Sequence, residues 1–453
     1  MNFRPSGAWD RLAAVLLVLA FALAGWKILQ RAPASPFAVQ SGSASTEALK
    51  LQPRVSLPSQ QLSPDGRFRF DAQFVSSSPG QAVHAASLVE LSDGRLRAVW
   101  FSGSREGARD VTIQTSVMDP VSLRWGAEST LFDRQQLQQG LWRYIKKLGN
   151  PVIARAPDGS LCIWMVNVSL GGWAGSSITW ARSVDEGATW SAPHRLVTSP
   201  FLNISTLVKG APVSFQDGQI GLPVYHEFIT KFGEMVRINA QGQVVDKIRI
   251  PGSQTSLQPV VLVTGSETAD VYMRSGTATA LMASQTTDAG KTWSSTRAST
   301  WPNPDSALAG VVTQAGARWL ALNPAPRNRE VLALLQSGPG ASFDSVTPWI
   351  VESSATPQAR TSVQDYERLL TQELKARGAS EDQARAYVAS ARRQLCGEQS
   401  CSQEFSYPYL LQSRDGYLHL VYTWHRTRIK HVRLDPLQPF QAAPAVTSRV
   451  ATP

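Results

Sequence analysis

The feature that most constrains the fold is a pattern of apolar strand, tight turn and apolar strand that recurs six times along the 453 residues. An Asp-Gly pair between two alternating apolar runs is the strongest local signal for a β-hairpin. The turns lie at Asp93-Gly94, Asp158-Gly159, Asp217-Gly218, near Gly265, at Ala315-Gly316 and at Asp415-Gly416. Their glycines are 65, 59, 47, 51 and 100 residues apart. Periods near 50 residues, each holding several short strands, are typical of a β-propeller.

The long last interval contains a segment of a different kind. Residues 361–395 are rich in Ala, Glu, Arg and Leu at helical spacing, with a break at Gly378. Ser380 followed by Gln383 resembles a capping box that begins a second helix. We therefore expect an all-β fold, a six-bladed β-propeller over residues 63–440, with a helical-hairpin insert at about 358–400 before the last blade. Residues 441–453 form a C-terminal tail.

A second repeat, S/T-x-D-x-G-x-T-W, occurs at 183–190 and again at 286–293. The Asp is expected to accept backbone N–H groups across a tight turn, the Gly to take a positive φ, and the Trp to pack between blades. The residues with these structural roles are Asp185, Gly187, Trp190, Asp288, Gly290 and Trp293. The motif therefore indicates the fold and says little about chemistry.

On these motifs, residues from about 80 to 435 resemble the sialidase-like family of Asp-box (BNR) propellers. The resemblance implies a funnel at the propeller centre that binds an acidic sugar. In that family three Arg hold the sugar carboxylate, a Tyr–Glu pair supplies the nucleophile and an Asp acts as acid/base. A Tyr nucleophile is an exception to the two-carboxylate scheme of most glycosidases.

The resemblance implies catalytic roles at two places. The stretch FSGSREGARD resembles the segment that carries a substrate-binding Arg and the acid/base, which gives Arg105 and Asp110 these roles. The stretch EFSYPYL puts Tyr407 at the position of the nucleophile, near Glu404.

Three further arginines are candidate substrate ligands. The resemblance places Arg274, in VYMRS, and Arg329, in LNPAPRNREV, at the second and third carboxylate-binding positions. Arg426 lies beside Trp424 in YTWHRTRIKH, and an aromatic ring next to cations suits a sugar or its carboxylate. A guanidinium binds a carboxylate through two parallel hydrogen bonds, so a cluster of arginines favours an anionic ligand.

The chain departs from the family at two positions. His84 stands where the first carboxylate-binding Arg belongs, and Gln258 where the Glu that polarises the Tyr belongs. A Tyr with its ordinary pKa near 10 is a poor nucleophile without a base. Glu227, in PVYHEF, and Glu404 are the candidates to replace that Glu.

Together these features predict an exported glycan-active protein, a sialidase-type exo-glycosidase acting on an acidic sugar or polysaccharide. Two alternatives stay open: a non-catalytic propeller that binds envelope glycan or protein, and a polysaccharide lyase on the same fold. The net charge is +10, but the Lys and Arg residues are scattered, so we expect no nucleic-acid partner. We expect no cofactor, no metal site and a monomer.

The N-terminal residues 1–31 differ from the rest. Leu12–Leu29 is an apolar run preceded by Arg4 and Arg11, and eighteen helical residues span roughly 27 Å. We favour an uncleaved signal-anchor in the inner membrane, with the propeller in the periplasm or extracellular space. The alternative is a signal peptide cleaved at the small-x-small triplet 22–24, which releases a secreted or periplasmic protein. Residues 32–62, rich in Ala, Pro, Ser and Gln, read as a flexible linker.

The chain has three cysteines. Cys396 and Cys401 are close enough in sequence to pair across a tight loop, and export favours a disulfide. Cys162 lies inside an apolar strand pattern and is expected to be a buried thiol.

Overall fold

The computed structural model describes residues 7–29, 35–39, 60–199, 203–353 and 361–438, and the chain divides into two compact units, Met1–Ser35 and Pro36–Pro453. The first unit contains one described helix, α1 (Gly7–Leu29). The sequence led us to expect a membrane-spanning segment here. Among the residues described, however, no helix combines the length and the apolar character that crossing a membrane requires.

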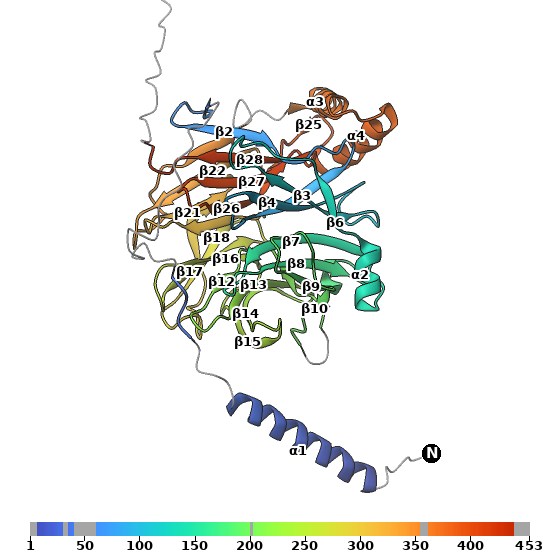
Figure 1. The fold of residues 1–453 in the computed structure, drawn as a ribbon, viewed down its shortest axis with the longest axis vertical. Helices are drawn as coiled ribbons and strands as arrows, with labels where there is room; N and C mark the ends of the chain where they lie inside the picture. Colours follow the sequence, from blue (N-terminus) through green and yellow to red (C-terminus); the bar gives the residue numbers. More distant parts are fainter. Residues whose placement is uncertain (1–6, 30–34, 40–59, 200–202, 354–360, 439–453) are drawn as a thin grey trace, which may run out of the picture. The chain divides into compact units, whose positions relative to one another are not determined.

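The second unit is a six-bladed β-propeller, as predicted, and Figure 1 shows its blades. Each of the first three blades is an antiparallel sheet whose strands follow one another along the chain. Blade 1 contains β3 (Ala82–Glu90), β4 (Leu96–Gly103), β5 (Thr112–Met118) and β6 (Ser129–Phe132). Blade 2 contains β7 (Lys147–Arg155), β8 (Leu161–Val168), β9 (Ser176–Ser183) and β10 (His194–Arg195). Blade 3 contains β11 (Leu207–Val208), β12 (Val213–Ser214), β13 (Ile220–Glu227), β14 (Lys231–Ile238) and β15 (Val244–Arg249), with β11 and β12 both paired to β13.

The other three blades follow the same plan. Blade 4 contains β16 (Ser256–Val263), β17 (Ala269–Ser275), β18 (Ala280–Thr286) and β19 (Arg297–Pro302). Blade 5 contains β20 (Ala309–Val312), β21 (Arg318–Leu322), β22 (Val331–Ser337) and β23 (Trp349–Ser353). Blade 6 contains β26 (Phe405–Gln412), β27 (Leu418–Trp424) and β28 (Arg428–Leu434), and two strands from the start of the propeller complete it, β2 (Arg69–Phe74) and β1 (Gln61–Leu62).

The ring is therefore closed by hydrogen bonds between the two ends of the propeller chain. β2 pairs antiparallel with β28, so that Asp71 lies opposite Arg433 and Phe74 opposite Lys430. The sequence analysis did not predict this closure, although β1 and β2 are joined by a tight turn at Asp65-Gly66 that carries the same hairpin signal as the other blades.

Several strands read as continuous apolar runs because each blade packs between two others. All eight residues of β8 are buried. One core cluster contains Trp100 of blade 1, Trp164 of blade 2 and Val236 of blade 3. The exclusion of apolar surface from water on both faces of a blade is the main force that holds the blades together.

Each blade also has a non-glycine residue with a left-handed backbone near the start of its innermost strand or just before it. These residues are Ala85, Asn150, Ser205, Gln258, Asp305 and Tyr407, with φ between 39° and 58°. In β3, β7, β16 and β26 the register shifts at this point, which marks a β-bulge. A bulge turns a side chain out of the regular alternation, and here it occurs at equivalent positions around the propeller.

The two Asp boxes lie in the β9–β10 and β18–β19 connections and are structural, as expected. The carboxylate of Asp185 accepts hydrogen bonds from Thr189 N (2.9 Å) and Thr189 Oγ1 (2.5 Å). Asp288 makes the same two bonds with Thr292, at 2.9 and 2.6 Å. Gly187 and Gly290 both have positive φ, and Trp293 is buried. These turns therefore close the outer hairpins of blades 2 and 4.

The helical insert is confirmed, with slightly different limits. α3 (Val363–Ala376) and α4 (Glu381–Leu395) follow β24 (Thr361–Ser362) and precede β25 (Ser400–Cys401), and they lie together beside blade 6 (Figure 1). The capping box of Ser380 and Gln383 is present, and Cys396 and Cys401 form the predicted disulfide. Arg377 of the insert donates hydrogen bonds to the carbonyl oxygens of Thr427 and Ser78. The insert therefore supports the loop between β27 and β28.

Two short helices and one docked segment were not predicted. α2 (Arg134–Leu141) begins with a capping box at Asp133, and η1 (Trp173–Gly175) follows β8. Within the expected linker 32–62, Phe37 is fully buried and stacks on Phe215 at 5.0 Å between ring centroids. This part of the segment is thus bound to the propeller, because a single large aromatic side chain provides enough apolar area to hold it.

Blade 6 contains a buried chain of hydrogen bonds. Trp125 Nε1 donates to His431 Nδ1 (3.2 Å), His431 Nε2 contacts His419 Nδ1 (2.9 Å), and His419 Nε2 contacts Ser413 Oγ (2.8 Å). An indole N–H can only donate, so it fixes His431 as a neutral ring that donates from Nε2 to His419. The chain is complete only when both imidazoles are neutral.

Candidate functional site

The propeller has two chemically different ends. In an antiparallel blade the first and third turns lie at one end, and the loop between the second and third strands lies at the other, together with the connection to the next blade. We call the first the hairpin end, because it carries the six short turns and the Asp boxes. We call the second the site end. The candidate residues Glu227, Arg274, Arg329, Glu404 and Arg426 come from strand ends and loops of the site end.

The hydroxyl of Tyr407 is held by two side chains of blade 4. Arg274 Nη1 donates to it at 3.1 Å and Gln258 Nε2 at 3.3 Å, while Arg274 Nη1 also contacts Gln258 Oε1 at 3.2 Å. The ring of His84, from blade 1, packs against Tyr407 at a tilt of 45°, with centroids 4.0 Å apart. Because these groups come from blades 1, 4 and 6, they meet near the centre of the propeller.

The same network continues through two residues that the sequence did not single out. Gln258 Nε2 lies 3.4 Å from the hydroxyl of Tyr225, which also accepts a hydrogen bond from Asn150 Nδ2 at 3.2 Å. Asn150, Gln258 and Tyr407 are three of the four left-handed residues that lie at bulges. The bulges thus direct polar side chains toward one another. The local sequence does not signal this for Gln258 or Tyr407, since Gln and Tyr rarely adopt this backbone.

Beside this network lies a cluster of paired charges around Glu404. This carboxylate is buried, and it accepts hydrogen bonds from Arg329 Nη1 (2.9 Å), Arg426 Nε (2.7 Å) and Ser406 Oγ (2.6 Å). Burial alone would raise its pKa, but Arg426 and Arg329 outweigh that effect and hold the pKa of Glu404 well below its usual range. Glu404 is therefore placed as a permanent anion between two guanidinium groups.

Two further acids complete the cluster. Glu106 accepts a hydrogen bond from Arg426 Nη1 at 2.7 Å, and Asp305 accepts one from Arg274 Nε at 2.6 Å. The Asp305 carbonyl also accepts from Arg329 Nη2 at 2.8 Å. Both acids were missed in the sequence. Glu106 lies within the FSGSREGARD stretch and was a visible candidate, whereas Asp305 carried no signal.

Glu227 lies half-buried at the end of β13, with its backbone N bonded to Ser205 Oγ at 2.8 Å. Burial raises the pKa of its carboxyl group, and this outweighs the opposing effect of Arg274 and Lys231. A carboxyl with a raised pKa holds its proton longer as pH rises, which is what a general acid needs.

Asp110 and Arg105 lie on the same loop as Glu106, and both side chains are exposed. The Asp110 carboxylate accepts hydrogen bonds from Ser104 N (2.9 Å) and Ser104 Oγ (3.0 Å), which stabilise the loop. The structure therefore brings His84, Gln258, Arg274, Arg329, Glu404, Tyr407 and Arg426 together and places Asp110 and Arg105 on a loop above them. Their chemical roles stay predictions.

Two buried basic groups lie next to Tyr407. Burial, with a further contribution from Arg426, lowers the pKa of His84 well below its usual value, and His84 Nδ1 contacts Thr423 Oγ1 at 2.9 Å. Lys209, in the gap between β11 and β12, donates to Pro408 O at 3.0 Å, and burial lowers its pKa to about 7. Its Nζ lies 5.9 Å from the centroid of the Tyr407 ring. A lysine in the apolar run LVKGAP was a signal that the sequence analysis did not use.

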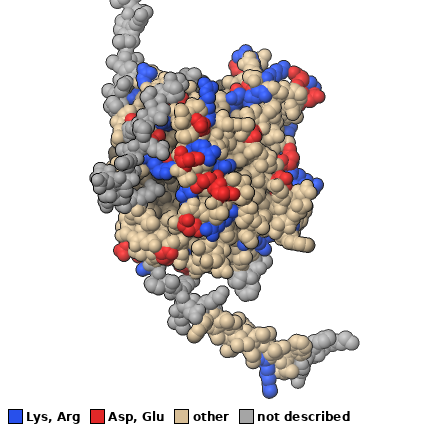
Figure 2. Space-filling model, in the orientation of Figure 1, with Lys and Arg blue, Asp and Glu red and all other residues tan. Residues whose placement is uncertain are grey.

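On the face of the molecule seen in Figure 2, acidic and basic side chains are intermixed near the middle and form no continuous patch of one charge. Across the described ranges, we find no group of three or more His, Cys, Asp or Glu side chains placed to hold a metal ion.

A ring of six blades with Asp boxes and an arginine-rich polar centre defines a sialidase-like propeller. The family model described as "BNR repeat-like domain" matches residues 94–420, more than half of the chain, and the chain belongs to this family. Among curated proteins, no sequence relative matches.

Solved structures share the fold at low sequence identity. A Hadza microbial sialidase is 13% identical with a TM-score of 0.58, over 78% of this chain and 66% of its own. The intramolecular trans-sialidase of Ruminococcus gnavus is 11% identical with a TM-score of 0.56, over 82% and 98%. A protein of unknown function from Dyadobacter fermentans is 9% identical with a TM-score of 0.59, over 84% and 100%. At such identities the similarity shows the fold alone.

Proposed function

We propose that this protein is an exported glycosidase that acts on an acidic sugar or polysaccharide through the pocket at the site end. The observation that carries the proposal is the hydroxyl of Tyr407, which accepts a hydrogen bond from Arg274 at 3.1 Å beside the Glu404 cluster. A guanidinium next to a phenol favours the phenolate, which is the nucleophilic form. Support also comes from the intramolecular trans-sialidase of similar fold.

In this proposal Tyr407 attacks the anomeric carbon and loses its proton to solvent. The bond to the leaving oxygen breaks as the Tyr407–carbon bond forms, and Glu227 gives its proton to that oxygen. Water then releases the sugar from Tyr407. The guanidinium groups of Arg274, Arg329 and Arg426 attract the sugar carboxylate. Each of them already has a protein carboxylate as a partner. The substrate must therefore share these guanidinium groups instead of meeting free ones.

A second candidate, a non-catalytic glycan-binding propeller, is favoured by one observation. The group that contacts Tyr407 OH from β16 is the amide of Gln258, at 3.3 Å, and an amide cannot take the phenol proton. In this case the same pocket binds an acidic glycan without cleaving it.

The two candidates are separated by Tyr407→Phe, which removes only the hydroxyl. The full chain and this variant are assayed on aryl sialosides and on uronate-containing polysaccharides. If the protein is a glycosidase, the variant loses turnover by roughly 10³-fold or more while binding survives. Tyr272→Phe, in blade 4 against Phe343, is the matched control and keeps full activity. Binding without turnover in both the parent and Tyr407→Phe supports the second candidate.

Glu227→Gln and Asp110→Asn identify the proton donor. Loss of a general acid costs about 10²- to 10⁴-fold for substrates with poor leaving groups and little for those with good ones. We expect this pattern for Glu227→Gln. The same pattern for Asp110→Asn alone would assign the role to Asp110, as the family resemblance implied.

We further propose that the N-terminal segment exports the chain. The apolar helix α1 and the Cys396–Cys401 disulfide both suit an oxidising compartment outside the cytoplasm. Fractionation and N-terminal sequencing of the mature protein distinguish a membrane-held chain from a released one. A chain found with both thiols reduced in the cytosol would contradict export.

A further inference from the structure

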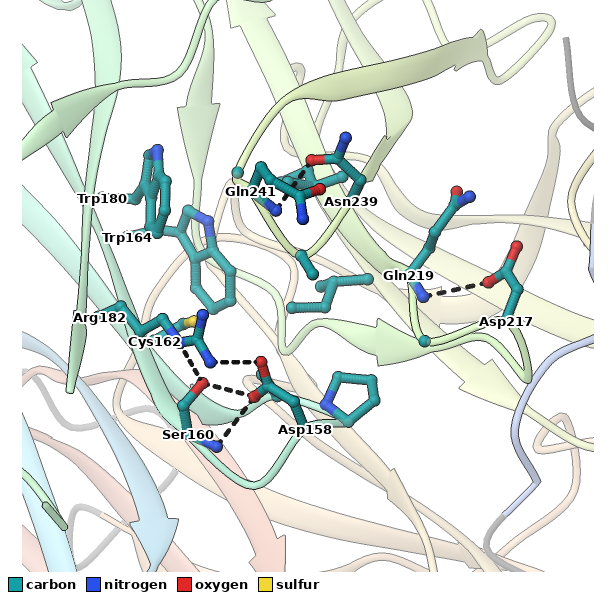
Figure 3. A pocket seen from close by; sticks show the side chains of 17 residues that line it. Asp158, Ser160, Cys162, Trp164, Trp180, Arg182, Asp217, Gln219, Asn239 and Gln241 are labelled. Atoms are coloured by element: carbon teal, nitrogen blue, oxygen red, sulfur yellow. Dashed lines mark hydrogen bonds and ion pairs between the residues drawn. The ribbon is translucent and has the colours of Figure 1, made fainter. Parts of the chain in front are cut away.

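The hairpin end contains a cavity between blades 2 and 3, with a volume of about 430 Å³. Figure 3 shows its walls. Blade 2 contributes Cys162, Trp164, Trp180 and Arg182, and blade 3 contributes the turns at 217–220 and 238–242. A volume of this size lies in the range of ligand-binding pockets.

The cavity has a clear structural cause in blade 3. Blade 4 connects its third and fourth strands by an Asp box, and Trp293 of that box is buried between blades 3 and 4. Blade 3 makes the same connection by a short turn that begins at Asn239 and has no Trp. Gly242, in this turn, lies so close to the Trp180 ring that a Cβ there would be 1.9 Å from a ring carbon. The turn therefore closes over Trp180 but leaves the space beside it unfilled.

The equivalent space between blades 3 and 4 is filled by a segment of this chain. Phe37 inserts there against Phe215, and its flanking backbone is held by Phe37 N to Ser266 O (2.7 Å), Ala38 N to Ser214 O (2.8 Å) and Gln216 N to Pro36 O (2.9 Å). Phe215 N bonds Gln219 O, and Ala156 N bonds Ser160 O in the same way in blade 2. Ala156 is thus the counterpart of Phe215, and its smaller side chain leaves the blade 2–3 space more open.

The walls of the cavity favour an uncharged, apolar occupant. Arg182 and Asp158 neutralise each other at 2.6 Å, and Arg182 Nε also bonds Ser160 Oγ at 2.8 Å. The Asn239 side chain is used within its own turn, where its oxygen accepts from Gln241 N and Gln243 N. The remaining lining includes the indoles of Trp164 and Trp180, whose flat apolar faces suit another aromatic ring.

We propose that the cavity between blades 2 and 3 is a docking site for an aromatic side chain on an extended segment of a partner polypeptide. Residues 36–38 show, one blade further on, how such a segment is held in this fold. The site is independent of the proposed function, because it lies at the opposite end of the propeller from Tyr407.

Cys162 provides a direct test. Cys396 and Cys401 are joined, so Cys162 is the remaining thiol of the three cysteines, and it lines the cavity. The probe is a capped peptide copy of residues 34–40 (ASPFAVQ), and its control carries Phe37→Ala. A small neutral thiol reagent labels Cys162 in the full chain. At ten times its Kd the probe slows labelling by about 10-fold, and the control peptide leaves the rate unchanged.

Variants of the cavity give a second readout, by calorimetric titration of the peptide. Cys162→Ala keeps the space and keeps binding, whereas Cys162→Phe fills the space and abolishes it. The proposal is overturned if both peptides protect Cys162 equally or neither does. It is also overturned if free indole protects and the peptide does not, which would indicate a small-molecule pocket. Cys162 is buried, which raises the pKa of its thiol to about 11, so if it does not react in the native chain the calorimetric titration alone decides. Protection that depends on protein concentration would mean that a second copy occupies the space, and it overturns the proposal.

Discussion

Two sets of ion pairs, one at each end of the propeller, place the same residue types in different surroundings. At the site end, Arg329 and Arg426 lie about one-fifth exposed and clasp Glu404, whose side chain is 2% exposed. At the hairpin end, Arg182 and Asp158 form an equally short pair, but their side chains are 34% and 38% exposed. A buried charge depends on its partner, whereas an exposed one has water as an alternative. The Glu404 cluster is thus built from groups that cannot be removed singly.

The most direct test of this comparison is to replace one arginine at each end. Arg426→Ala leaves Glu404 and Glu106 short of a cation, and because Arg329 remains, we expect a loss of about 3 kcal/mol in the free energy of unfolding. Arg182→Ala, the matched control, should cost less than about 1 kcal/mol. Urea denaturation of both variants measures the difference. Equal losses in the free energy of unfolding would mean that burial at the site end does not increase the contribution of the ion pairs to stability.

Buried histidines at both ends make the free energy of unfolding depend on pH. Burial lowers the pKa of His419 to about 3, while in the unfolded chain it titrates near 6.5. Below pH 6.5 the unfolded chain therefore binds a proton that the folded chain does not, so this contribution to stability is present above pH 6.5 and is lost as pH falls toward 3. Each such histidine adds up to about 1.4 kcal/mol per pH unit.

Denaturation at pH 7, 6 and 5 tests this expectation. His419→Gln, in the hydrogen-bonded chain of blade 6, and His84→Gln, beside Tyr407, should each make the free energy of unfolding depend less steeply on pH. The decrease should equal the contribution of one histidine. His194→Gln, at an exposed position in β10, should leave the slope unchanged. An unchanged slope in His419→Gln would show that this imidazole is already protonated in the folded state.

The smallest effect is expected at the Asp boxes. Asp288→Ala removes the bonds to Thr292 N and Thr292 Oγ1 from a carboxylate that is mostly in water, which should cost about 0.5–1.5 kcal/mol. Asp185→Ala should behave alike, because the two boxes make the same bonds. Thermal unfolding of both variants provides the measurement, and a loss above that of Arg426→Ala would reverse the order of the two ends.

The turns of the hairpin end could be predicted from local sequence patterns, whereas the pairing of side chains at the site end could not. Asp-Gly turns, Asp boxes and the capping box of Ser380 are local patterns, and local patterns determine turns and helix starts. The ion pair of Arg426 with Glu106 joins residues 320 positions apart, and no local pattern specifies such a pair. Family resemblance supplied Arg274, Arg329 and Tyr407, but it did not reveal that each arginine is already paired. The docking of Phe37 was not predicted, because a single aromatic residue in an irregular segment shows no periodic pattern.

The pairing of β2 with β28 has a consequence for biosynthesis. Asp71 and Arg433 face each other in blade 6, so the last blade is complete only after nearly the whole chain has been made. Strand pairings between residues so distant in sequence form slowly, because a long loop must close first. Until then the chain is an open arc with an unfinished blade at its end. The ring therefore cannot shut while its final strand is still on the ribosome.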